Sequence, residues 1–183
     1  MSNKAHYAVT VISKDRPGIV ADTAEVLYRL GCNVEDSSCT MLGGDFAMIL
    51  TVSHQKPFTK SRLVDEFKRL HDDKGLVAHV RGLSEEELNS PDPSGELCII
   101  SVYGADRPGI VYRVTRELAD RQVNISDLNT KLIGTEDEPV YVMMLEAYLP
   151  LGTTVEDADN LLTGLRAELN VEIGVRAITS VSL

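Results

Sequence analysis

Aromatic side chains are scarce in this sequence: among its 183 residues there is no tryptophan and there are only three phenylalanines. The hydrophobic core must therefore be built mainly from aliphatic side chains. No apolar run approaches the ~20 residues that a membrane-spanning helix needs, and the first residues lack the apolar stretch of a secretory signal. These absences predict a globular cytoplasmic protein that neither spans a membrane nor is secreted.

Cysteine and histidine are also few. The three cysteines, Cys32, Cys39 and Cys98, are odd in number and show no Cys-X-X-Cys spacing, so we expect reduced thiols. Cys39 and Cys98 lie in strand-like apolar surroundings, where we expect them to be small core residues. The four histidines are scattered, and none has the spacing of a metal ligand relative to another histidine or cysteine. The sequence therefore predicts no metal site and no cofactor.

Positive charge is in short supply, with 18 Lys and Arg against 28 Asp and Glu and a formal net charge of −10. Such a surface repels the phosphate backbone of DNA or RNA. A sheet of the RNA-recognition type would also need exposed aromatic residues and a basic surface, and the sequence shows neither. We therefore expect no direct contact with nucleic acid.

An internal repeat organises the chain. The hexapeptide Asp-Arg-Pro-Gly-Ile-Val at 15–20 recurs at 106–111, an offset of 91 (106 against 15). The offset grows to 95 (141 against 46) after a longer turn at 134–139, where an insertion is tolerated. Residues 84–95 are acidic, broken by proline and nearly free of apolar side chains, which is typical of a linker. We expect one domain over 1–83, this linker over 84–95, and a second domain over 96–183.

Each repeat has the pattern β-α-β-β-α-β. In the first we expect a strand over 7–12, a helix from 19 that ends before 31, a hairpin of 33–41 with 46–53, a helix around 63–70, and a strand over 76–81. The second gives 97–103, 109–121, 124–132, 140–148, 154–169 and 171–178, with Thr154 and Asp157 as a helix-start capping pair. This predicts an α+β protein with two ferredoxin-like domains, each a four-stranded antiparallel sheet with both helices on one face. Because open sheet edges favour pairing, we expect the two sheets to join side by side into eight strands, and the chain to form a homodimer.

The repeated turn has the chemistry of a ligand site. Pro17 suits the first position of a helix, which would place Arg16 at the N-cap. Gly18 would then expose unpaired N–H groups that attract a carboxylate, while Asp15 and its counterpart Asp106 supply an acceptor for an amine. Donors beside one acceptor favour a zwitterion such as a free amino acid. The alternative is that the turn only joins a strand to a helix.

On these motifs the chain resembles the ACT-domain family of small-molecule-sensing modules. The resemblance rests on the doubled hexapeptide and on Cys32-Asn33-Val34 and Val123-Asn124-Ile125, and it covers nearly the whole chain outside the linker. It implies an amino-acid effector bound between paired ACT domains. The ligand-binding residues that it implies are Asp15, Arg16, Pro17, Gly18, Ile19 and Asn33 in the first copy, and Asp106, Arg107, Pro108, Gly109, Ile110 and Asn124 in the second. A local cap or turn role is the alternative for the two asparagines.

Residues 31–50 have a closer likeness to a stand-alone tandem ACT regulator of transcription. That likeness implies an amino acid such as glycine as effector, and a protein partner such as a transcriptional activator, without DNA contact. A stand-alone ACT pair that regulates a metabolic enzyme is the alternative. An acylphosphatase-like hydrolase shares the topology, but each turn here has one glycine and an aspartate that would repel phosphate. We therefore expect no enzymatic activity.

Overall fold

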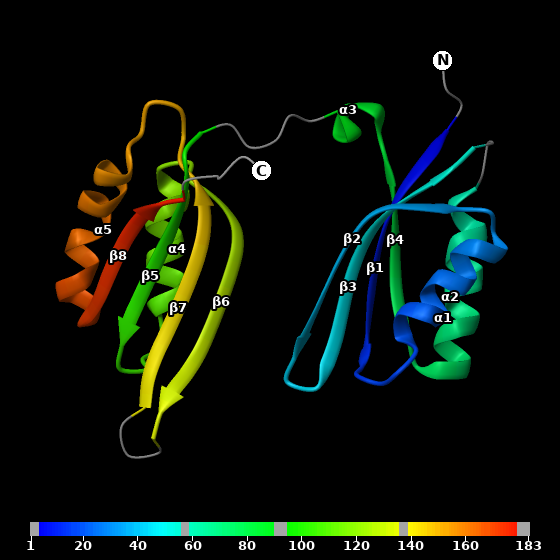
Figure 1. Cartoon of the computed structure of the whole chain (residues 1–183), viewed down its shortest axis with the longest axis horizontal. Helices are drawn as coiled ribbons and strands as arrows, with labels where there is room; N and C mark the ends of the chain where they lie inside the picture. Colours follow the sequence, from blue (N-terminus) through cyan, green and yellow to red (C-terminus); the bar gives the residue numbers. More distant parts are fainter. Residues whose placement is uncertain (1–3, 56–58, 90–94, 136–138, 179–183) are drawn as a thin grey trace. The chain divides into compact units, whose positions relative to one another are not determined.

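The chain folds as two compact units, Met1–Ser90 and Pro91–Leu183. A computed structural model describes residues 4–55, 59–89, 95–135 and 139–178 (Figure 1). Each unit contains one β-α-β-β-α-β repeat, so the internal repeat of the sequence corresponds to a repeat of structure.

The first unit is a four-stranded antiparallel sheet with the strand order β2-β3-β1-β4. Its elements are β1 (Ala5–Lys14), α1 (Ile19–Arg29), β2 (Asn33–Leu42), β3 (Asp45–His54), α2 (Lys60–Lys74) and β4 (Val77–Leu83). Both helices cover the same face (Figure 1). Because side chains alternate along a strand, Tyr7, Val9 and Val11 of β1 are buried on the helix face.

The second unit repeats this topology with the order β6-β7-β5-β8. Its elements are β5 (Leu97–Gly104), α4 (Ile110–Asp120), β6 (Asn124–Gly134), β7 (Pro139–Tyr148), α5 (Val155–Leu169) and β8 (Val171–Ala177). The predicted cap of α5 is confirmed: Thr154 and Asp157 form a reciprocal capping box. Both units interrupt the same ladder at the same place, between Val34 and Asp36 and between Ile125 and Asp127. The two units therefore share even the position of this strand irregularity.

The two cores are mainly aliphatic, as the composition predicts. Cys98 is fully buried in the second core, and burial raises the pKa of its thiol to about 11. The expectation that Cys39 is a core residue is wrong, because it is exposed on β2. This strand forms an edge of its sheet, and all ten of its residues are exposed. An apolar sequence pattern marks a strand, but it does not reveal which strand lies beyond the cover of the helices.

The expected linker contains one ordered turn. Ser84 and Glu87 form a capping box at the start of the short helix α3 (Glu85–Leu88), while residues 90–94 lie outside the described part of the chain. Residues 136–138 of the longer turn at 134–139 also lie outside it. The strands form two sheets of four, and the joining of these sheets into one of eight strands stays a prediction. None of the helices that the structure describes has the length and apolar character needed to span a membrane.

Candidate functional site

The repeated hexapeptide folds into a tight turn in each unit. Helix α1 begins at Ile19, and its N-cap is Gly18 with φ 94° and ψ −1°. In the second unit α4 begins at Ile110 after Gly109, whose φ is 98° and ψ −9°. These angles are those of the glycine at the third position of a type II turn, which proline precedes by preference. The expectation that Arg16 is the N-cap and Pro17 the first helical residue is therefore wrong by two positions, because the Pro-Gly pair is used for the turn.

The turn leaves the start of each helix uncapped by any side chain. The backbone N–H groups of the first helical turn thus lack their usual side-chain acceptor. In the first unit the turn is fixed to the sheet, because Asp15 N donates to Gly44 O of the β2–β3 hairpin at 3.0 Å. An open depression of about 520 Å³ lies beside it, lined by Asp15, Arg16 and Gly18 and by the apolar side chains of Met41 and Phe46.

The structure assembles only part of the predicted residue set within one unit. Ile19 and Ile110 are each 2% exposed, and their side chains belong to the two cores. Asn33 opens β2, whereas the turn lies beside the far end of that strand, where Leu42 and Lys14 both pair with Asp45. Nine residues at ~3.3 Å each separate the two ends, or about 30 Å. Asn124 stands at the corresponding end of β6.

The arginine of the first turn is engaged within its own unit. Arg16 Nη2 donates to Asp22 Oδ2 at 2.7 Å, and Lys74 from the end of α2 contacts the other oxygen of the same carboxylate. The Lys74 ammonium, and then the Arg16 guanidinium, hold the pKa of Asp22 below its ordinary value. The Asp22 side chain is 12% exposed, whereas its partners Arg16 and Lys74 are 35% and 43% exposed, so the cluster is partly exposed to water.

The second turn has different surroundings. Arg107 forms no hydrogen bond or ion pair with any residue that the structure describes. Tyr141 of β7 lies where the first unit has Phe46, and burial together with the nearby charge of Asp106 raises the pKa of its hydroxyl. The second turn therefore offers a hydroxyl where the first offers only hydrocarbon.

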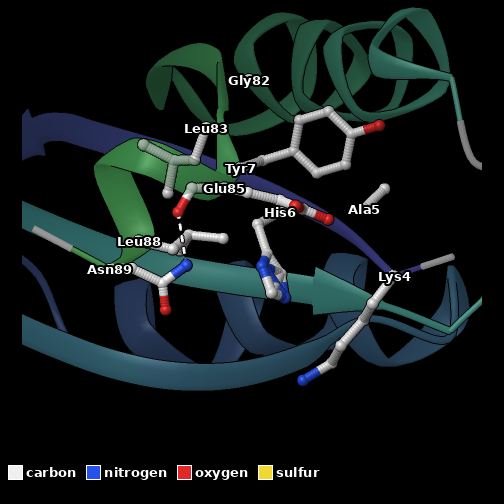
Figure 2. A pocket seen from close by; sticks show the side chains of 9 residues that line it. All are labelled: Lys4, Ala5, His6, Tyr7, Gly82, Leu83, Glu85, Leu88 and Asn89. Carbon is white, nitrogen blue, oxygen red and sulfur yellow. Dashed lines mark hydrogen bonds between the residues drawn. The ribbon is translucent and has the colours of Figure 1, made fainter. Parts of the chain in front are cut away.

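A separate cavity of about 440 Å³ lies between the start of β1 and the short helix α3 (Figure 2). Figure 2 shows the His6 ring on the same side of β1 as Leu88 and Asn89, with the Tyr7 ring on the opposite side. Asn89 is fixed by a 2.6 Å hydrogen bond from its amide nitrogen to Glu85 O. Both ring nitrogens of His6 are buried and have no hydrogen-bond partner in the described part of the chain. Sequence reasoning counted His6 only as one of the four scattered histidines and missed this cavity.

Comparison with known proteins agrees with the fold and the turns. Residues 6–81 and residues 99–162 each match the ACT domain. The chain belongs to the ACT-domain family. The two matched segments carry the two turns, so each turn sits between the first strand and first helix of an ACT domain.

Several relatives match along nearly the whole length of this chain. The glycine cleavage system transcriptional repressor of Escherichia coli is 24% identical over 181 residues, which cover 97% of this chain and 93% of that protein. The crystal structure of a protein from Galdieria sulphuraria superimposes with a TM-score of 0.79 at 27% identity, covering 96% of this ACT chain and 99% of the other. A candidate glycine cleavage system transcriptional repressor of known structure gives a TM-score of 0.71 at 20% identity, covering 97% and 99%. The similarity thus extends over both ACT domains.

Proposed function

We propose that this tandem ACT protein is a non-enzymatic regulator that binds an amino acid such as glycine at the Asp-Arg-Pro-Gly turn. It then controls transcription of glycine-cleavage genes through a protein partner. The observation that carries this proposal is the match to the Escherichia coli repressor along nearly the full length of both chains. The net charge of −10 supports a protein partner over direct DNA binding.

The position of the asparagines supports a site that needs two ACT domains. Strands β2 and β6 are edge strands with almost every residue exposed. If two such edges pair antiparallel, the start of one strand lies beside the end of the other. Asn33 or Asn124 of one domain then reaches the turn of its neighbour, from which it is about 30 Å distant within its own domain. Edge pairing would in this way complete the predicted residue set.

The turn chemistry favours binding over hydrolysis. Each turn has one glycine and an acidic first residue. A phosphate cradle needs several convergent N–H groups without a carboxylate beside them. Among the residues that the structure describes, no group of three or more acidic, histidine or cysteine side chains is arranged to hold a metal ion.

The direct test is isothermal titration calorimetry of the full chain with each of the twenty amino acids. We expect heat from one or a few of them, and loss of that heat in the double variant Asp15→Ala/Asp106→Ala. The double variant Asp65→Ala/Asp73→Ala removes the same charge from the exposed face of α2 and should bind as the wild type does.

A reporter driven by a glycine-cleavage promoter tests the regulatory half of the proposal. The wild-type chain should repress it and the Asp15→Ala/Asp106→Ala variant should not. Absence of binding by all twenty amino acids, with repression unchanged in that variant, would overturn the proposal.

A further inference from the structure

The two units connect their helices by ion pairs of opposite polarity. Asp22 of α1 and Arg113 of α4 occupy equivalent positions, since both lie at the offset of 91 (113 against 22). Asp22 pairs with Lys74 of α2, whereas Arg113 Nη2 lies 2.6 Å from Glu168 Oε1 of α5. The acid is on the first helix in one unit and on the second helix in the other. The two repeats therefore differ in the sign of the charge at one position of the first helix, close to the turn.

This reversal determines what the arginine of each turn contacts. In the first unit the Asp22 carboxylate attracts Arg16, whose Nη1 also donates to Pro17 O at 3.2 Å. The guanidinium folds back over the turn, and Nη1 lies 3.6 Å from the position that a Cβ on Gly18 would take. Arg16 thus already binds a carboxylate of its own chain.

In the second unit, no atom of the described residues beyond positions 108–110 lies within 4 Å of the position that a Cβ on Gly109 would take. Arg107 has no acidic partner among the described residues, and the position equivalent to Asp22 carries the like charge of Arg113. A carboxylate that arrives here gains a guanidinium that has no acidic partner among the described residues.

We propose that the two turns are unequal: the effector's carboxylate binds at the second turn, through Arg107, while Asp22 keeps the first turn from binding it by occupying Arg16. This inference rests on the proposed function, because it assumes that the chain binds an amino acid. At the first turn an incoming carboxylate would have to separate Arg16 from Asp22. That exchange trades one charged hydrogen bond for another with little net gain, and leaves a largely buried acid with one partner fewer.

The side chains beside each turn agree with this division. Tyr141 of β7 stands where the first unit has the hydrocarbon ring of Phe46, and its hydroxyl is in hydrogen-bond contact with Thr130. A zwitterion at the second turn would meet the acid Asp106 and the cation Arg107, which are adjacent in the chain. The first turn lies beside the apolar side chains of Met41 and Phe46, and its arginine is paired with Asp22. In this division the first turn keeps only a structural role.

Amide NMR of the full chain, titrated with each of the twenty amino acids and with acetate as a carboxylate alone, tests the inference. We expect chemical-shift changes at Gly109 and Ile110 and none at Gly18 and Ile19, with one ligand bound per chain. Shifts at Gly18 and Ile19, with or without shifts at the second turn, would overturn the inference but leave the proposed function standing. Absence of shifts at both turns with every amino acid would overturn both.

Three variants test the roles of the charges. Arg107→Gln should weaken binding about tenfold or more, because a hydrogen bond to a charged group is lost. Arg121→Gln removes the same charge from the other end of α4 and should leave the affinity unchanged. Asp22→Asn releases Arg16 and should raise the stoichiometry from one to two ligands per chain. A stoichiometry of one in a folded Asp22→Asn variant, verified by circular dichroism, would overturn the role given to Asp22.

Discussion

The turn glycine of the second unit offers a test of its backbone geometry. Gly109 has φ 98°, a conformation that L side chains rarely adopt, yet a Cβ added there would meet no atom within 4 Å among the described residues other than its chain neighbours. Any cost of Gly109→Ala is therefore conformational and not steric. Left-handed backbone costs an L residue roughly 1–2 kcal/mol, so we expect the unit to lose about that much stability.

The same substitution at Gly164 should have the opposite sign. Gly164 lies inside α5 of the same unit, and beyond the backbone of that helix its added Cβ would also meet no atom of the described residues within 4 Å. Alanine is favoured over glycine in a helix interior by about 1 kcal/mol. The two variants differ from the wild type by one methyl group each, so packing cannot account for the predicted difference of about 2–3 kcal/mol between them.

Thermal and urea unfolding, followed by circular dichroism and by the amide signals of the second unit, would measure both variants. For a domain of this size ~1 kcal/mol corresponds to a change in Tm of about 4–8 °C. Gly109→Ala should melt below the wild type and Gly164→Ala above it. A Gly109→Ala variant as stable as the wild type would refute the assignment of positive φ to this turn.

Three further predictions follow from single side chains. Lys74 and then Arg16 hold the pKa of Asp22 below its ordinary value of 3.8, so the stability that the carboxylate adds is present above that value and is lost as the pH falls through the folded pKa. The Tm difference between wild type and Asp22→Asn should therefore shrink as the pH is lowered from about 5 to about 3. A Tm difference that stays constant over this range would contradict the prediction. Exposed Cys39 should react with a thiol reagent in the native protein, whereas buried Cys98, with its raised pKa, should react only on unfolding, as mass spectrometry of the labelled chain would show. His6→Phe removes two buried nitrogens that have no partner in the described part of the chain, and should leave the unfolding free energy unchanged or raise it by up to ~1 kcal/mol; a clear loss of stability in urea would show that the imidazole has a partner.

The architecture could be predicted from the sequence because the signals were local and doubled. Alternation in the strands, helical spacing of Leu63 and Phe67, and the Thr154 capping pair each specify a segment of a few residues. The repeat then confirms each segment a second time. Cys39 shows the limit of such reasoning, since its exposure depends on strand order and strand order is not a local property.

The candidate site was harder to predict because its parts lie far apart along the chain. The hexapeptide marked the turn, but the choice of N-cap depended on Gly18 adopting a positive φ, which placed the helix start two residues later than expected. Asn33 was grouped with the turn through resemblance, and the register shows that it stands at the other end of the strand. The partners of Asp22 and Arg113 are separated from them by 52 and 55 residues, so only the packing of the helices reveals them.

The reversed ion pair shows how a duplicated domain can change its site while keeping its fold. An ion pair between two helices needs opposite charges, but the acid can be on either helix without changing the fold. Such partly exposed ion pairs contribute little to stability in either order. The turn arginine depends on this choice, because in the first unit it pairs with the acid on the first helix. With Asp22 on that helix the arginine is neutralised, and with Arg113 there it is left without an acidic partner among the described residues. Exchanging the charges of Asp22 and Lys74 should therefore leave Arg16 without its acidic partner, as Arg107 is among the described residues, while the unfolding free energy of the first unit stays nearly constant.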